Sequence, residues 1–273
     1  MVVQHNLSAM NTSRQMNSVS SAMSKSTEKL SSGYKINRAG DDAAGLSISE
    51  KMRSQIRGLN KAASNAQDGI SLVQVAEGAL NETHSILQRM NELATQAAND
   101  TNTSVDRTAI KAEIDQLTSE IDRIQSTTQF NSMNLLDGTF SSNQLKLQVG
   151  ALNGQSIGVS IAKMSVSGLK LKNKMNVSSF SAAGTAMKTI QEAIKTVSDT
   201  RSKLGAIQNR LEHTINNLNT TSENTQAAES RIRDTDMASE MVEYSKNNIL
   251  AQAGQSMLSQ ANQQTQGVLS LLQ

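Results

Sequence analysis

Long helical segments with narrow apolar seams occupy both ends of this chain, and no other feature constrains its fold as strongly. The 273 residues include 0 Pro, so no proline interrupts a helix at either end. A seam of one or two apolar residues per turn buries too little surface to offset the entropy of ordering an isolated helix. We therefore expect both terminal segments to be covered by another copy of the chain or by a partner.

The composition favours thin helical contacts over a conventional globular core. Aromatic residues make up 2% of the chain, so 13 Met together with Ala, Leu and Ile must supply the packing. The net charge of +2 is spread without blocks of like charge, which argues against nucleic acid or an anionic membrane as a partner. With 0 Cys, a disulfide is impossible.

The N-terminal residues lack the basic and then apolar pattern of a cleaved signal peptide, and no later stretch approaches a membrane span. We therefore expect no membrane insertion. The chain either stays in the cytoplasm or leaves by a route that needs no cleaved signal.

A heptad repeat predicts the first helix. Its seam consists of Ala9, Thr12, Met16, Val19, Met23, Ser26 and Leu30. Gly33 is a suitable helix stop, and Asp41 is a plausible cap for the helix that follows.

Residues 44–99 are predicted to form a much longer helix, of about 84 Å at a rise of 1.5 Å per residue. Apolar residues recur along it at a spacing of three and four, and residues 110–124 repeat the pattern in a third helix. These lengths predict a rod. From Ala182 a further helix carries a seam that can lie along both of these helices.

The period changes to two between residues 129 and 179, which predicts a β-hairpin region. Alternating apolar residues flank Asn153-Gly154, a pair that tolerates positive φ at both turn positions. Phe130, Phe140 and Phe180 lie in or beside this region. We expect it to be the most globular part of the chain and to cap one end of the rod.

The predicted fold is mainly α: a long antiparallel helical rod or coiled coil with a small β-hairpin region, and terminal helices paired as an inner coiled coil. We expect residues 1–43 with 230–273 to form a terminal coiled-coil domain that is disordered in the free subunit. We expect residues 44–229 to form a helical rod domain that includes the β-hairpin region 129–179. The last segment carries an apolar stripe formed by Ile249, Leu250, Ala253, Met257, Leu258, Ala261, Val268, Leu271 and Leu272.

No catalytic, metal-binding or cofactor-binding constellation is recognisable in the sequence. His5, His84 and His213 are far apart, and none has a second His at metal-ligand spacing. Glu82 lies two residues from His84, hence on a different helix face. Asp41 with its neighbour reads better as a helix cap than as a metal pair. We expect no enzyme, no cofactor and no metal.

Four stretches resemble the signatures of bacterial flagellins. Residues 30–46 (LSSGYKINRAGDDAAGL) and 62–72 (AASNAQDGISL) resemble the N-terminal signature. Residues 228–238 (AESRIRDTDMA) and 252–262 (QAGQSMLSQAN) resemble the C-terminal one. The resemblance covers roughly the first 140 and the last 90 residues.

The resemblance implies a subunit that polymerises with copies of itself into the extracellular flagellar filament, for motility. It implies export in an unfolded state without a cleaved signal peptide, and assembly at the filament tip. Its partners would be a flagellar export chaperone at the C-terminal segment, the export apparatus, and the cap and hook-junction proteins. Since only residues 129–179 stand where many flagellins carry outer domains, we expect a minimal subunit with inner domains only.

The resemblance and the seams together predict two sets of interaction residues. Residues predicted for polymerisation through the inner helices are Met16, Val19, Met23, Leu30, Leu250, Met257, Leu258 and Val268. Residues 88–96 and 111–114 resemble the epitope of the animal innate immune receptor for flagellin, with Arg89, Leu93 and Glu113 as the matching contacts. Alternatively, Leu93 contacts the next subunit.

Two other classes of protein stay open at this stage. A filament-junction or cap protein shares the terminal helices but forms a short ring. A cytoplasmic signalling coiled coil would show longer, more regular heptads and no central hairpin. A membrane-binding last helix is discounted because residues 252–273 contain no Lys or Arg.

Overall fold

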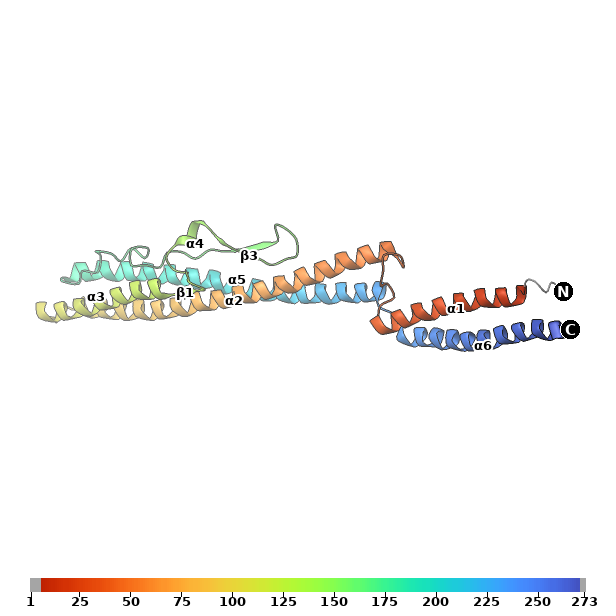
Figure 1. The fold of residues 1–273 in the computed structure, drawn as a ribbon. Coiled ribbons are helices and arrows are strands. Elements are labelled where there is room, and N and C mark those ends of the chain that lie inside the picture. The colour runs from red at the N-terminus through yellow and green to blue at the C-terminus, as the bar shows by residue number, and fades with distance from the viewer. Residues whose placement is uncertain (1–5, 271–273) are drawn as a thin grey trace. The chain divides into compact units, whose positions relative to one another are not determined.

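The computed structural model describes residues 6–270, apart from the side chains of residues 265, 266 and 268–270. Five long helices dominate it (Figure 1), so the predicted helical class is confirmed. They are α1 (Leu7–Ser32), α2 (Ala43–Ala97), α3 (Ser104–Thr127), α5 (Phe180–Arg233) and α6 (Met237–Ser270), and α4 (Thr139–Ser142) is a single turn. His5 and the predicted contact of Val268 fall outside the described residues and side chains.

The chain divides into two compact units, Met1–Ser54 with Glu223–Gln273 and Gln55–Ser222. We call the first the terminal unit and the second the central unit. The predicted assembly domains, residues 1–43 with 230–273 and residues 44–229, stay a prediction.

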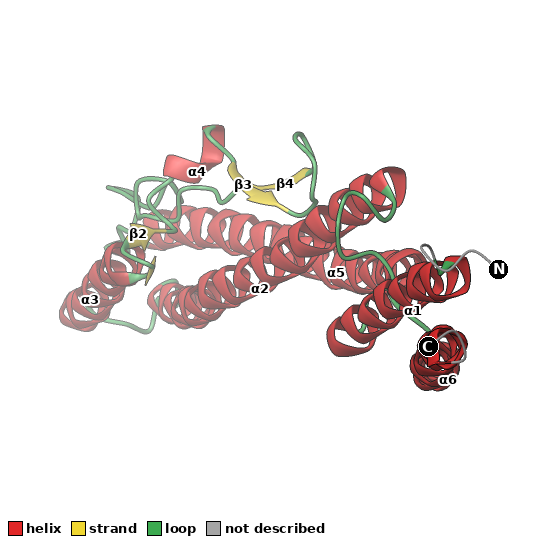
Figure 2. Ribbon diagram, turned by 45° about the vertical axis from the view of Figure 1, so that its right-hand side comes forward, coloured by secondary structure: helices red, strands yellow, loops and turns green. Residues whose placement is uncertain are grey.

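In the terminal unit α1 and α6 lie side by side and run antiparallel (Figures 1 and 2). At one end the Asn6 side-chain amide donates to the Ala261 carbonyl at 2.9 Å, and at the other Lys29 Nζ lies 3.3 Å from Glu240 Oε2. Helix α1 ends as predicted at Gly33, whose φ of 76° suits a residue without a side chain.

Backbone pairing joins the segment after α1 to the segment between α5 and α6. The amide of Lys35 donates to the Arg233 carbonyl at 2.7 Å, and the amide of Thr235 donates to the Gly33 carbonyl at 3.0 Å. The Arg233 guanidinium stacks 4.5 Å from the centre of the Tyr34 ring and pairs with Glu50 at 3.2 Å. These contacts lie where α1 ends and α6 begins.

The cap of α2 is one residue away from the predicted one. Asp42 Oδ1 accepts from the Gly45 amide at 2.9 Å, which is the N-terminal cap contact. Asp41 instead turns back, and its Oδ2 accepts from the amides of Arg38 and Asn37. These two amides lower the pKa of Asp41 below its ordinary value.

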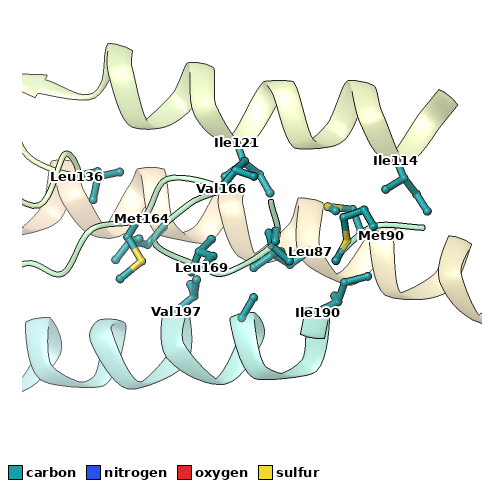
Figure 3. Close-up of a cluster of buried hydrophobic side chains, with 14 of the residues drawn as sticks. Leu87, Met90, Ile114, Ile121, Leu136, Met164, Val166, Leu169, Ile190 and Val197 are labelled. Atoms are coloured by element: carbon teal, nitrogen blue, oxygen red, sulfur yellow. The ribbon is translucent and has the colours of Figure 1, made fainter. Parts of the chain in front are cut away.

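The central unit has a continuous hydrophobic core between α2, α3 and α5. Leu87 and Met90 from α2, Ile114 from α3 and Ile190 from α5 are fully buried and point toward one another (Figure 3). The loop after the hairpin contributes to the same core, and its buried residues are Ile161, Met164, Val166, Leu169, Leu171, Met175 and Val177. This loop lacks periodicity, so the sequence did not identify it as core.

The predicted hairpin is present as β3 (Leu145–Gln148) and β4 (Ser156–Val159), which pair antiparallel with Leu147 opposite Ile157. Of the two turn residues expected to have a positive φ, Gly154 has one, of 85°, and Asn153 does not. A smaller pair, β1 (Gln129–Phe130) with β2 (Met133–Asn134), follows α3.

The hairpin does not cap the end of the rod as predicted but lies along its side (Figure 2). Ile157 packs with Ala66 and Ile70 of α2 and with Leu211 of α5 because its apolar face needs a helical surface to cover it. Phe180 also departs from the expectation, since it is 64% exposed at the start of α5.

Candidate interaction surfaces

The terminal unit lacks the kind of core that the central unit has. Among its described residues only two apolar side chains, Ile36 and Ala261, are buried. Three polar residues of the unit, Ser26, Ser49 and Asn247, are buried as well. The pairing of α1 with α6 therefore removes little apolar surface from water and contributes little stability.

Every seventh residue of α6 faces α1. These residues are Glu240, Asn247, Gly254 and Ala261, and they are half-buried or buried. Sequence reasoning named only Ala261 of this row, because the row contains no large apolar residue. Its signal is the heptad spacing of polar and small residues.

The predicted polymerisation residues fall into two groups. Met16, Val19, Met23, Leu30 and Leu258 are half-buried in or beside the α1–α6 seam. Leu250 and Met257 are 46% and 58% exposed and do not form the seam itself. With Met16, Val19 and Ala253, they line a shallow groove between the two helices.

Large exposed apolar side chains gather on α1 and α6, which we call the terminal apolar surface. It consists of Leu7, Met10, Met237, Met241, Val242, Ile249, Leu250 and Met257. Because the two helices share almost no core, exposed apolar residues in such numbers favour burial against another protein.

The predicted epitope residues lie on α2 and α3 in the central unit. Arg89 Nε and Nη2 donate to Glu113 Oε1 at 3.1 and 3.0 Å, and Arg89 Nη1 donates to Glu92 Oε2 at 3.2 Å. The carboxylates of Glu113 and Glu92 raise the pKa of Arg89 above its ordinary value. Arg89 and Glu113 are exposed and available to a partner.

Leu93 does not lie on this surface. It is 2% exposed and belongs to the core of the central unit, because its face of α2 is covered by the rest of that unit. The prediction that Leu93 contacts a receptor, or the next subunit, is therefore revised: this side chain supports the helix that carries Arg89.

The described residues contain no group of three or more His, Asp or Glu side chains that would hold a metal ion. His84 bonds to Gln88 along one face of α2, with 3.1 Å between the two side-chain nitrogens. Within the same described range, no helix has the length and apolar character needed to cross a bilayer.

Comparison with known proteins decides the family. Residues 3–141 match the family described as bacterial flagellin N-terminal helical region, and residues 187–272 match the bacterial flagellin C-terminal helical region. The chain belongs to the bacterial flagellin family. A flagellin from Halalkalibacterium halodurans is 56% identical over 273 residues and covers 100% of both chains. One from Bacillus subtilis is 53% identical over 304 residues, again covering 100% of both.

The fold agrees with this family. The crystal structure of Bacillus cereus flagellin matches with a TM-score of 0.50 and 32% identity, over 61% of this chain and 94% of that one. As a flagellin, the chain is a structural subunit of the flagellar filament, outside the cell, and it polymerises with copies of itself. It is not an enzyme.

Proposed function

We propose that this flagellin folds its terminal unit only as it joins the filament, so that assembly and terminal folding are one coupled step. The observation that carries the proposal is the terminal apolar surface on a pair of helices with almost no core of its own. Covering that surface with neighbouring subunits supplies the burial that the pair lacks.

In this proposal residues 1–43 and 230–273 are disordered in the free subunit and form the inner coiled coil of the filament, whereas residues 44–229 form a rod that is folded throughout. Each subunit adds to the tip by a contact between unlike surfaces. A contact of that kind, repeated with a rotation that does not close, generates an open helix suited to motility.

The inner contact is tested by changing Met257 and Leu258 together to Asp. Because these positions lie outside the central core, the variant should keep the helix content and thermal transition of the unmodified chain. It should not polymerise when seeded with filament fragments in a salting-out buffer, as judged by negative-stain electron microscopy.

The matched control changes Val105 and Leu152 to Asp, which are 77% and 68% exposed in the central unit. It adds the same charge away from the terminal apolar surface and should form filaments. Normal filaments from the Met257 and Leu258 variant would contradict the assignment. Short rings from the unmodified chain would favour a filament-junction protein.

We propose further that the chain leaves the cell unfolded through the flagellar export apparatus, without a cleaved signal peptide, and meets the cap and hook-junction proteins outside. The export chaperone binds the C-terminal segment, since α6 exposes Met241, Ile249 and Met257. Removal of residues 237–273 should abolish a one-to-one complex with the chaperone in size-exclusion chromatography, whereas removal of residues 1–32 should not.

A second proposed role is as a ligand of the animal innate immune receptor for flagellin, through Arg89 and Glu113. Both are exposed and joined across α2 and α3, so they present one surface. Arg89→Ala should weaken receptor signalling in a reporter cell line. Arg123→Ala removes a comparable exposed ion pair, with Glu120, and should leave signalling unchanged. Equal effects of the two changes would contradict this role.

A further inference from the structure

The row of α6 residues that faces α1 is polar or small, whereas a helix pair that is stable by itself has large apolar residues there. Glu240 and Asn247 occupy two positions of the row, and Gly254 and Ala261 occupy the other two. Several large apolar side chains of the same helix are exposed, such as Ile249 and Met257 at 66% and 58%, whereas Leu258 is half-buried. A stable two-helix pair places its large apolar residues in the seam.

The two polar residues of the row are incompletely paired. Asn247 is 5% exposed, and its Nδ2 has no hydrogen-bond partner in the described part of the chain. Glu240 reaches Lys29 through Oε2 at 3.3 Å, but its Oε1 is buried without a partner there. Ser26 of α1 is buried at 3% exposure. Closing this half of the seam therefore removes polar atoms from water without replacing their hydrogen bonds.

In the other half of the seam, at Gly254 and Ala261, the α6 residues that face α1 are small. A side chain added at Gly254 would place its Cβ 3.9 Å from the Met16 Cβ, so Met16 lies against bare helix backbone. Ala261, level with Asn6, offers one methyl group. This half closes without strain, but apart from the half-buried Met16 and Leu258 it buries little apolar area.

We propose that Asn247 and Glu240 act as an assembly brake: they hold the α1–α6 pair below the stability at which it folds alone, so the terminal unit orders only against a second copy of the chain. The second copy covers the terminal apolar surface and supplies the missing burial. This inference rests on the coupled folding proposed above and assigns it to two residues. Without them, free subunits would pair their terminal helices early and associate away from the filament tip.

The test is Asn247→Leu in the full chain, which replaces the unpartnered amide by an apolar side chain at the same seam position. Limited proteolysis of the dilute free subunit measures how often the terminal segments open. Cleavage within residues 6–32 and 237–264 should slow about tenfold, the effect of relieving one buried unsatisfied polar group. Filament growth without seeds should start after a shorter lag, and seeded growth should persist.

The control is Gln255→Leu, the same kind of change at an exposed position of α6. It should protect neither terminus. Glu240→Leu leaves Lys29 in contact with solvent and, like Asn247→Leu, should slow cleavage of the terminal segments.

The outcomes separate this inference from the proposed function. If the unmodified free subunit already resists cleavage at both ends, coupled folding itself is refuted. If the unmodified chain is cleaved and the Asn247→Leu chain is cleaved equally fast, only the brake is refuted. Protection by Gln255→Leu, or loss of seeded growth in Asn247→Leu, would also overturn the brake, because the effect would then not come from the seam.

Discussion

The loop of the β3–β4 hairpin packs against α2 at Gly58 but not at Gly78. Replacing each of these glycines by Ala should therefore change the stability of the central unit in opposite directions. At Gly78 nothing lies within 4 Å of an added Cβ. At Gly58 the added Cβ would lie 2.8 Å from the Cβ and 3.3 Å from the Cα of Ala151, in the hairpin loop. Both changes to Ala improve helix propensity, but only Gly58→Ala forces the hairpin to move.

The loop has little freedom to move. The Gln148 side-chain amide donates to the carbonyls of Gly150 and Leu152 at 2.9 and 2.7 Å, and the Val149 amide donates to the Gln155 carbonyl at 2.9 Å. The overlap at Ala151 must therefore displace the loop as a whole, which costs about 1–3 kcal/mol.

Helix propensity and overpacking together set the expected changes in the free energy of unfolding. Gly78→Ala should stabilise the central unit by about 0.5–1 kcal/mol through helix propensity alone. Gly58→Ala gains the same amount from helix propensity, but the cost of overpacking outweighs it. This change should therefore destabilise the central unit by up to about 2 kcal/mol. A difference of about 2 kcal/mol corresponds to roughly 4–8 °C in Tm for a unit of this size.

The assay is thermal unfolding of the full chain, followed by circular dichroism in the helix band and repeated in urea. Gly78→Ala should raise Tm and Gly58→Ala should lower it. If Gly58→Ala raised Tm as much as Gly78→Ala does, the hairpin loop would not press on α2, and the reasoning would fail.

Other predictions concern the core, a helix cap, pH and the terminal unit. Leu87→Ala should destabilise the central unit by about 2–5 kcal/mol in urea unfolding, whereas Val75→Ala, at a 40% exposed position of the same helix, should cost under about 0.5 kcal/mol. Thr103→Ala removes the capping box of α3 and should cost about 1 kcal/mol by the same assay. The Thr103 hydroxyl lowers the pKa of Asp106. The stability that this carboxylate contributes is therefore present above its ordinary pKa of 3.8 and is lost as the pH falls below it. In an acid titration, Thr103→Ala should lose less free energy of unfolding than the unmodified chain does. In assembled filaments, where the terminal unit is ordered, Arg233→Ala removes the contacts to Tyr34 and Glu50 and should speed hydrogen exchange at the Lys35 and Thr235 amides, with exchange in α3 as the internal reference.

Local pattern was enough to predict the helices and the hairpin. The heptad of α1, its stop at Gly33 and the presence of the hairpin depend on spacing and on turn residues, and both are written in short stretches of sequence. The register of the hairpin, with Leu147 opposite Ile157, differs from that of a two-residue turn at Asn153-Gly154 and was decided by packing. The flagellin signatures added the family and the filament role, which periodicity alone does not supply.

The choice of face on α6 was decided by the tertiary structure. Apolar residues surround much of this helix, so the sequence allowed a seam through Leu250 and Met257 as readily as one through Gly254 and Ala261. In the structure Met16 of α1 lies opposite Gly254, and Asn6 lies opposite Ala261, so the packing of the two helices selects this face and leaves Leu250 and Met257 exposed.

The position of Leu93 was also decided by packing. The resemblance to the receptor epitope grouped it with Arg89, but the other elements of the central unit cover the Leu93 side of α2 and leave the Arg89 side open. The sequence by itself determined which segments are helical and which ends lack a core. Which side of each helix meets water depends on side-chain volumes that come together only when distant segments pack.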